Sequence, residues 1–230
     1  MDSKQPPKAR PGMDIWQVWN DSLAEKMNQQ GLDLTAQAEY LAQAVQQSRA
    51  RDDRPALWAA LNALSKISLA LKLLPQARHM AGEALGLAEE LWGADSPEAG
   101  TVISDLIFLE ALHGHEERSL ILSQRLRQII QASLEAGLDR AFSYNLTSLA
   151  TFYSLQGQDQ ATEDLLWGVA RLAEEDPQAD PDLLLFVYDN LGGFYQAKDD
   201  PDKARLARDC ALKVMERAGY RADAGQVTRH

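Results

Sequence analysis

The segment Asn190-Leu191-Gly192-Gly193-Phe194-Tyr195 is the clearest copy of a pattern that recurs along the chain. Its leucine is the last of five, which are separated by 41, 42, 43 and 42 residues: Leu23, Leu64, Leu106, Leu149 and Leu191. A small residue follows each leucine after 12 or 13 residues: Ala36, Ala77, Ser119, Ala161 and Ala204. A period of this length is typical of a solenoid, in which each unit buries its apolar face against its neighbours. We therefore expect an all-α stack of about five helix pairs.

Proline and glycine mark where these helices begin and end. Ser96-Pro97-Glu98, Asp180-Pro181-Asp182 and Asp200-Pro201-Asp202 each place a capping side chain before a proline and an acid, as a helix start prefers. Glycine adopts the left-handed conformation of a helix C-terminus at low cost, and it stands at the expected stops: Gly93, Gly114, Gly137 and Gly157. The helix pairs are predicted over residues 15–50, 54–93, 97–136, 139–176 and 181–218. The first helix of each pair carries the leucine, and the second carries the small residue.

The Pro- and Lys-rich residues 1–13 are predicted to be a disordered lead-in, residues 14–220 the solenoid, and residues 221–230 a flexible tail.

The last copy of the pattern closely resembles a tetratricopeptide repeat (TPR). In that family a leucine, the small residue after it, an aromatic residue and two alanines form the seam of the helix pair. Here these positions are held by Leu191-Gly192, Tyr195, Ala204 and Ala211. The copy from Leu106 to Ser119 departs most from the pattern, because Glu110 replaces the expected aromatic residue.

The repeat is longer than the 34 residues usual for TPRs. The spacing of about 42 residues and the junction Leu91-Trp92-Gly93-Ala94-Asp95-Ser96-Pro97 are similar to the kinesin light chain subtype. The resemblance implies a right-handed α–α superhelix that acts in protein–protein interaction.

Charge and composition exclude several classes of function. The 230 residues carry a formal charge of −11, whereas a nucleic-acid-binding face must be basic. No apolar stretch approaches the roughly 18 residues that span a bilayer, and the N-terminal residues show no apolar signal segment. The single cysteine, Cys210, cannot form an intrachain disulfide and fits a reducing compartment. We expect a cytoplasmic protein without nucleic-acid or membrane partners.

The resemblance also implies a binding surface, because in this family the first helices line a concave groove. Side chains that face away from the seam would contact the ligand: Asn62, Lys66, Phe108, Leu112, Tyr144, Thr151, Leu155, Phe186, Asp189 and Gln196. Lys66 alone is basic, so the groove does not match members that hold a peptide's terminal carboxylate. Its aromatic and aliphatic residues favour an apolar or amphipathic segment of a partner protein.

A core role competes with ligand contact at several of these positions. Aromatic and leucine side chains at this spacing also pack between adjacent first helices. The core role is favoured for Leu112 and Leu155, and both roles stay open for Phe108 and Tyr144.

Other constellations are discounted as sites. His113-Gly114-His115 lies at a turn without a third or fourth ligand nearby, so no metal or cofactor is expected. Cys210 is expected to be a packed residue, since no histidine is placed to activate it. The tryptophans are expected to pack between repeats: Trp16, Trp19, Trp58, Trp92 and Trp167. Because a solenoid end without a polar cap promotes self-association, a homodimer through an end is also considered.

We expect a non-catalytic adaptor or scaffold. Two alternatives stay open: a regulator that senses a short peptide through the curvature of the solenoid, and a metal-dependent enzyme built on His113 and His115.

Overall fold

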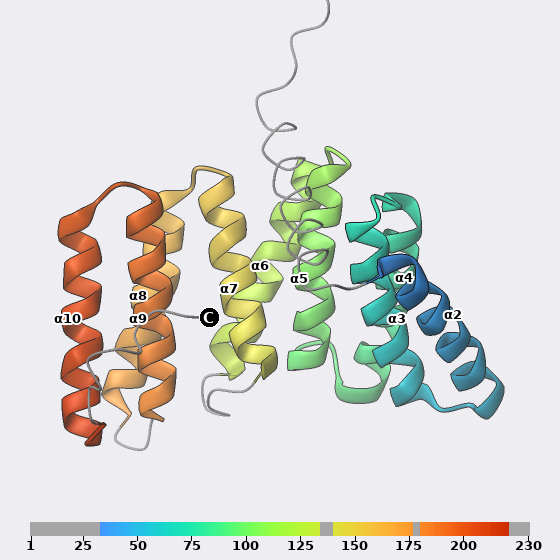
Figure 1. The fold of residues 1–230 in the computed structure, drawn as a ribbon, viewed down its shortest axis with the longest axis horizontal. Coiled ribbons are helices and arrows are strands. Elements are labelled where there is room, and N and C mark those ends of the chain that lie inside the picture. Colours follow the sequence, from blue (N-terminus) through green and yellow to red (C-terminus); the bar gives the residue numbers. More distant parts are fainter. Residues whose placement is uncertain (1–32, 134–139, 177–179, 221–230) are drawn as a thin grey trace, which may run out of the picture. The chain divides into compact units, whose positions relative to one another are not determined.

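The computed structural model describes residues 33–133, 140–176 and 180–220. All regular secondary structure within these ranges is α-helical (Figure 1): α2 (Leu34–Arg51), α3 (Arg54–Ala70), α4 (Leu74–Trp92), α5 (Pro97–Leu112), α6 (Glu116–Ser133), α7 (Arg140–Leu155), α8 (Asp159–Glu175), α9 (Pro181–Ala197) and α10 (Pro201–Ala218). The chain divides into two units, residues 1–129 (unit 1) and residues 130–230 (unit 2), with the boundary inside α6.

The predicted helix pairs are confirmed where the structure describes them. Pairs α3–α4, α5–α6, α7–α8 and α9–α10 occupy the four predicted ranges from residue 54 onward, within a few residues at each end. The second helix of the first pair is α2, while the first helix of that pair lies outside the described residues. Antiparallel neighbours such as α3 and α4, or α9 and α10, lie side by side in Figure 1. Of the described helices, none combines the length and apolarity needed to cross a bilayer.

The predicted helix starts are formed by side-chain caps. Ser96 Oγ accepts the Ala99 amide at 3.1 Å, and Asp200 Oδ1 accepts the Lys203 amide at 3.1 Å. Asp180 caps α9 in the same way. Each cap satisfies an amide that the first turn would otherwise leave without an acceptor, which typically contributes about 1 kcal/mol.

The predicted stops at glycine are also confirmed for described residues. Gly93, Gly114 and Gly157 have φ angles of 99°, 75° and 69°, a region that residues with a Cβ rarely adopt. Gly137 lies outside the described residues.

The seam of each helix pair is built from the repeating leucines and small residues. Leu64, Leu106, Leu149 and Leu191 are all buried. Ala77, Ser119 and Ala204 lie buried opposite them, and the Ser65 hydroxyl donates to the Ala77 carbonyl at 2.9 Å. A larger side chain at such a close approach would force the helices apart at a cost of about 1–3 kcal/mol. Ala161 is only half-buried, and Ala36 is exposed on α2.

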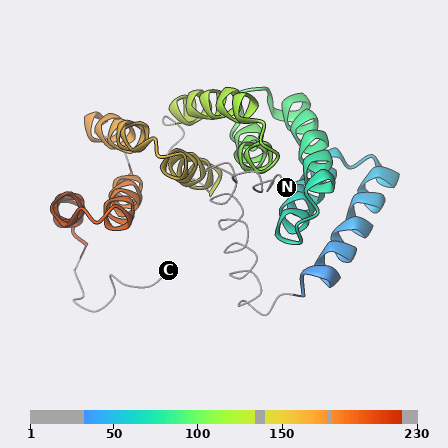
Figure 2. The same cartoon turned by 90° about the horizontal axis from the view of Figure 1, so that it is seen from above.

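First helices contact first helices within each unit. In unit 1, α5 contacts both α3 and α4, and in unit 2, α9 contacts both α7 and α8. Seen from above (Figure 2), α4 and α6 lie on one side of α5. Each unit therefore has a face made by its first helices and a face made by its second helices.

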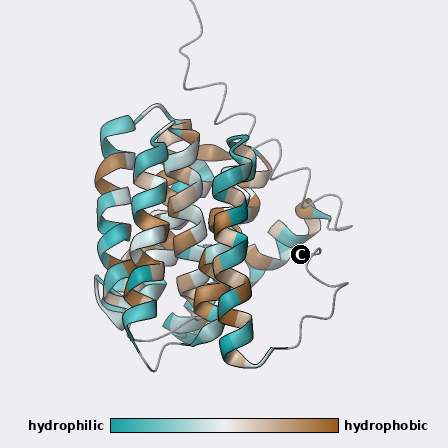
Figure 3. Cartoon of the chain, turned by 90° about the vertical axis from the view of Figure 1, so that its left-hand side faces the viewer, coloured by the Kyte–Doolittle hydropathy of each residue, from teal (hydrophilic) through white to brown (hydrophobic). Residues whose placement is uncertain are grey.

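The exposed face of α10, the last described helix, carries charged residues together with two exposed leucines, Leu206 (51% exposed) and Leu212 (42% exposed). Its outward residues include Arg205, Arg208, Asp209, Lys213 and Glu216. Figure 3 looks onto this end and shows hydrophilic residues interspersed with apolar ones. Because this outer face mixes charged and apolar residues, it neither forms a purely polar cap nor establishes a contact between copies, and dimerisation through this end stays a prediction. Trp16 and Trp19, which were expected to pack between repeats, lie outside the described residues.

Candidate partner-binding surfaces

One side of the first helices in unit 2 is left open to solvent. On α7 the exposed and half-buried side chains recur at helical spacing, at Tyr144, Thr147, Thr151 and Leu155. On α9 the corresponding stripe consists of Phe186, Asp189, Gly193 and Gln196. We call these eight residues the first-helix face of unit 2. Residues with this spacing share one side of a helix, so the stripe forms a continuous strip along each helix.

One hydrogen bond joins α7 to α9 beside the two strips, and a buried core lies behind them. The Thr147 hydroxyl donates to Asn190 Oδ1 at 3.3 Å, and the Asn190 amide nitrogen donates to the Phe186 carbonyl at 2.8 Å. On the opposite side of the same helices, Leu149 and Leu191 are fully buried. Six of the ten predicted site residues thus lie together: Tyr144, Thr151, Leu155, Phe186, Asp189 and Gln196.

The other four predicted residues lie in unit 1 on α3 and α5. Phe108 is only 4% exposed, which favours the core role for its ring. Leu112 is half-buried and packs against the core cluster of unit 1, as its predicted core role requires. Lys66 Nζ lies 3.5 Å from the buried carboxylate of Asp105. Asn62 is 8% exposed, and its Oδ1 finds no hydrogen-bond donor among the described residues.

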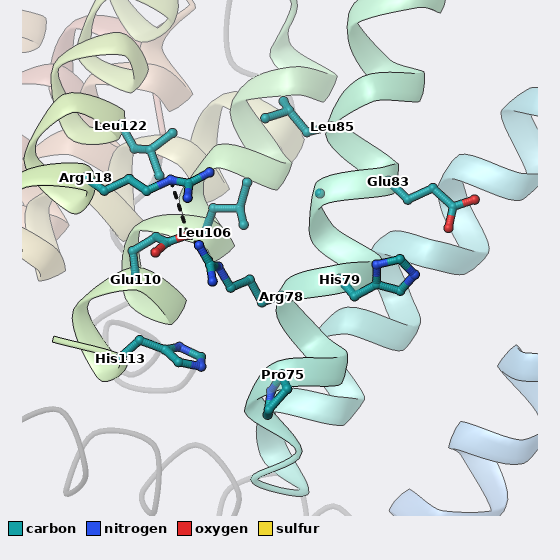
Figure 4. A pocket seen from close by; sticks show the side chains of 11 residues that line it. Pro75, Arg78, His79, Glu83, Leu85, Leu106, Glu110, His113, Arg118 and Leu122 are labelled. Carbon is teal, nitrogen blue, oxygen red and sulfur yellow. Dashed lines mark hydrogen bonds and ion pairs between the residues drawn. The ribbon is translucent and has the colours of Figure 1, made fainter. Parts of the chain in front are cut away.

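Sequence reasoning missed a second feature of unit 1, a cleft of about 680 Å³ between α4 and α6. The floor comes from α5, with Leu106 and Glu110, and the walls include Leu85 on α4 and Leu122 on α6. Figure 4 shows Arg78 entering from α4 and Arg118 from α6, so that both guanidinium groups approach Glu110. We call this the α4–α6 cleft.

Glu110 is the centre of a network of charged groups. Its side chain is 1% exposed, and Arg78 Nε donates to its Oε1 at 2.8 Å. His115 Nδ1 lies 2.6 Å from Oε2, and Arg118 Nε lies 3.5 Å from Oε1. Burial acts to raise the pKa of Glu110, but the hydrogen bonds of His115 and Arg78 and the charge of Arg118 outweigh it. The pKa of this carboxyl therefore lies below its ordinary value, and Glu110 is ionised at neutral pH.

The network gives the two turn histidines a structural explanation. The rings of His113 and His115 stack with centroids 5.8 Å apart, and His113 Nδ1 bonds the Leu109 carbonyl at 2.7 Å. Within the described ranges, no cluster of three or more residues is arranged to hold a metal ion. The sequence signal for the network was the acid at Glu110, where the repeat pattern calls for an aromatic residue.

Unit 2 carries aromatic residues where the repeat pattern expects them. Tyr195, the residue equivalent to Glu110, is 2% exposed, and its hydroxyl accepts the Trp167 indole N–H at 2.9 Å. Trp167 on α8 also packs edge-on against Tyr188 of α9, which confirms inter-repeat packing for this tryptophan. Trp58 instead meets Trp92 within its own helix pair, at 5.0 Å between centroids. Cys210 is half-buried, and burial raises the pKa of its thiol, as a packed residue requires.

Solved structures with the same fold are repeat proteins. The chain is similar to the nearly identical TPR-like repeats of a putative kinesin light chain from Podosopora anserina, with 16% identity and a TM-score of 0.58 over 89% of this chain and 97% of that one. A Q17M variant of that protein gives a TM-score of 0.59 at 16% identity, covering 90% and 98%. BtubC (BKLC) from P. vanneervenii is 13% identical, with a TM-score of 0.50 and 95% of each chain covered.

No protein-family model matches the sequence, and no curated protein is similar enough to match it. The fold alone therefore carries the comparison: this chain has the all-α fold of kinesin light chain-like TPR repeats.

Proposed function

We propose that the protein is a non-catalytic adaptor that binds an apolar or amphipathic segment of a partner protein on the first-helix face of unit 2. The TPR-like fold is a scaffold for protein interaction. The observation that carries the proposal is the half-buried state of Tyr144, Leu155 and Phe186 beside a sealed core. Large apolar side chains that stay partly exposed to solvent in the folded protein contribute binding energy when a partner covers them.

The polar members of this face suit an amphipathic ligand. Thr147, Asp189 and Gln196 are exposed beside the apolar side chains, so each strip combines apolar and polar groups. An amphipathic helix or an extended segment carries the same two kinds of group and pairs its apolar residues with Tyr144, Leu155 and Phe186.

The cytoplasmic location stays a prediction from the single cysteine.

Two substitutions test the first-helix face without removing a buried group. A Cβ at Gly193 meets no atom within 4 Å, so α9 has room for the side chain of Gly193→Leu. The leucine adds bulk to the first-helix face. Thr147→Arg does the same on α7. Gly82→Leu is the matched control, since Gly82 is also open but lies on α4, a second helix.

The assay pans a phage-displayed random peptide library against the wild type and the three variants, with melting curves for each. Sequences that are enriched on the wild type and on Gly82→Leu, but lost on Gly193→Leu and Thr147→Arg, support the proposal. Equal enrichment on all four proteins contradicts it.

Phe108 and Phe186 separate core from contact residues. Phe108→Ala is expected to lose about 3–5 kcal/mol of stability as a core truncation. Phe186→Ala is expected to lose less stability and to weaken capture of the selected peptides. Equal loss of stability in both variants would assign Phe186 to the core.

A further inference from the structure

The α4–α6 cleft has room for a ligand and an apolar floor. Leu85, Leu106 and Leu122 contribute apolar lining. Gly82 lies in the α4 wall, and a Cβ built there meets nothing within 4 Å. On the α6 side, Ile121 is 60% exposed and lies one helical turn after the lining residue Arg118. An exposed apolar residue beside a cleft is typical of a protein-binding surface.

Two arginines at this cleft pair with Glu110 through Nε and keep further N–H donors for a ligand. Arg78 and Arg118 both turn their Nε toward Glu110, and their side chains are 34% and 63% exposed. No acceptor among the described residues bonds their Nη atoms. A guanidinium presents a second planar edge of two N–H groups, which matches a carboxylate in a bidentate fork. Because Glu110 already orders these side chains, a ligand loses less conformational entropy in meeting them.

The charges around the cleft favour a ligand with single carboxylates over a highly charged anion. The chain carries −11 overall, so a positively charged surface on it is an exception. Glu110 balances part of the positive charge of the two arginines, and Glu83 in the α4 wall is paired with Arg49. A second hollow beside the cleft combines the same arginines with Glu116 and Glu117, whose charges repel an anion on that side. The arrangement therefore suits single side-chain carboxylates on an apolar backing better than a polyanion.

We infer that the α4–α6 cleft is a second docking site, which takes an acidic amphipathic segment of a partner protein. Aspartate or glutamate carboxylates of the segment meet the outer edges of Arg78 and Arg118, and its apolar residues lie against Leu85 and Leu122. This site is on the second helices of unit 1, whereas the proposed function uses the first helices of unit 2.

The test uses a fluorescein-labelled synthetic peptide that alternates pairs of leucine with pairs of glutamate, and a copy with glutamine in place of each glutamate. Binding is measured by fluorescence anisotropy at low and at physiological salt. We expect the glutamate peptide to bind at least about tenfold more tightly than the glutamine peptide, a difference that salt reduces.

Variants assign the binding to the cleft. Arg118→Gln removes an exposed guanidinium, and Gly82→Leu fills the cleft without touching a charge; each is expected to weaken the glutamate peptide about tenfold. Arg208→Gln on α10 and Gly168→Leu on α8 are the matched controls, and both should bind as the wild type does. Gly193→Leu reports whether the peptide uses the first-helix face instead. Melting curves establish that all five variants are folded.

Four results would overturn the inference. The first is equal affinity for the two peptides, and the second is wild-type binding by both Arg118→Gln and Gly82→Leu. The third is full displacement of the peptide by inorganic phosphate at concentrations near its own, which would mark a simple anion site. Loss of binding in Gly193→Leu alone would place the peptide on the first-helix face and would also contradict the inference.

Discussion

The same position of the repeat is filled by a carboxylate in unit 1 and by a phenol in unit 2. Glu110 and Tyr195 each lie four residues after the repeat leucine, and both are at least 98% buried. Around Tyr195, the Trp167 indole donates to its hydroxyl, Lys203 Nζ lies 5.2 Å from the centre of its ring, and Lys203 is itself paired with Glu163. Glu110 instead has Arg78, Arg118 and His115 around it.

The difference shows what a buried charge requires of its surroundings. A tyrosine fits the repeat by packing and one hydrogen bond, and it leaves no surplus of charge. A buried carboxylate is tolerated only with cations close by, and those cations must reach it from the surface. At Glu110 they come from α4 and α6, so the exchange of one core residue places two arginines at a cleft. The following predictions test this comparison, from the largest effect to the smallest.

Tyr195→Glu should be the most damaging exchange. It places a carboxylate in unit 2 with Lys203 nearby but without the two arginines, and an undercompensated buried charge typically costs about 3 kcal/mol or more. Urea unfolding of the variant and of Tyr195→Phe, which removes only the hydroxyl, measures the cost. If Tyr195→Glu loses no more free energy of unfolding than Tyr195→Phe, the surroundings of Tyr195 accept a carboxylate as those of Glu110 do, which would contradict the comparison.

Arg78→Gln should destabilise unit 1 by about 1–3 kcal/mol, because Glu110 loses the guanidinium that donates to its Oε1 while the carboxylate stays buried. The same change made together with Glu110→Gln should cost less, since no charge is then left without its partner. A double-mutant cycle from urea unfolding gives the coupling, expected at about 0.5–3 kcal/mol. Additive effects would show that the two side chains do not interact.

The fall of the free energy of unfolding at acidic pH should reflect the protonation of Glu110. The pKa of Glu110 in the folded protein lies below 4.5, the ordinary value of a glutamate side chain, so the charged form stabilises the fold above that pH. This contribution is lost as the pH falls through the folded pKa. Unfolding of the wild type and Glu110→Gln should therefore differ most near neutral pH and converge below pH 4.5. A constant difference across this range would contradict the lowered pKa.

Gly82→Ala and Gly168→Ala should both stabilise the protein slightly. Each glycine lies inside a helix, in α4 and α8, with open space at the Cβ position. Replacing glycine by alanine inside a helix gains about 1 kcal/mol through the lower entropy of the unfolded chain. Thermal melting of both variants tests whether the space at each Cβ position is open. A loss of stability in Gly82→Ala alone would mean that the cleft is narrower than described.

The helix pairs and their caps follow directly from the sequence, because they depend on local chemistry and on a repeated spacing. Ser96, Asp180 and Asp200 cap the helices that they were expected to cap, and the repeat leucines from Leu64 onward are buried. Spacing also placed six site residues on one face of unit 2. It does not determine depth: Phe108 and Tyr144 occupy similar faces of first helices, yet one is buried and the other half-exposed.

The α4–α6 cleft was beyond sequence reasoning for a related reason. Arg78 precedes Glu110 by 32 residues, and Arg118 comes from the next helix, so only packing of three helices brings them together. The exchange of an aromatic residue for Glu110 was visible in the sequence as a weak repeat. Its partners could have been sought among the basic residues next to the neighbouring seam positions Ala77 and Ser119.

A photo-cross-linking comparison tests most directly whether partners use the first-helix face. The photoreactive residue p-benzoylphenylalanine replaces either Gln196 on α9 or Arg208 on α10, both of which are exposed. Each protein is irradiated with a peptide that the wild type selects from the library. We predict cross-linking at position 196 and background levels at position 208. Equal yields at both positions, or a yield confined to position 208, would contradict binding on the first helices.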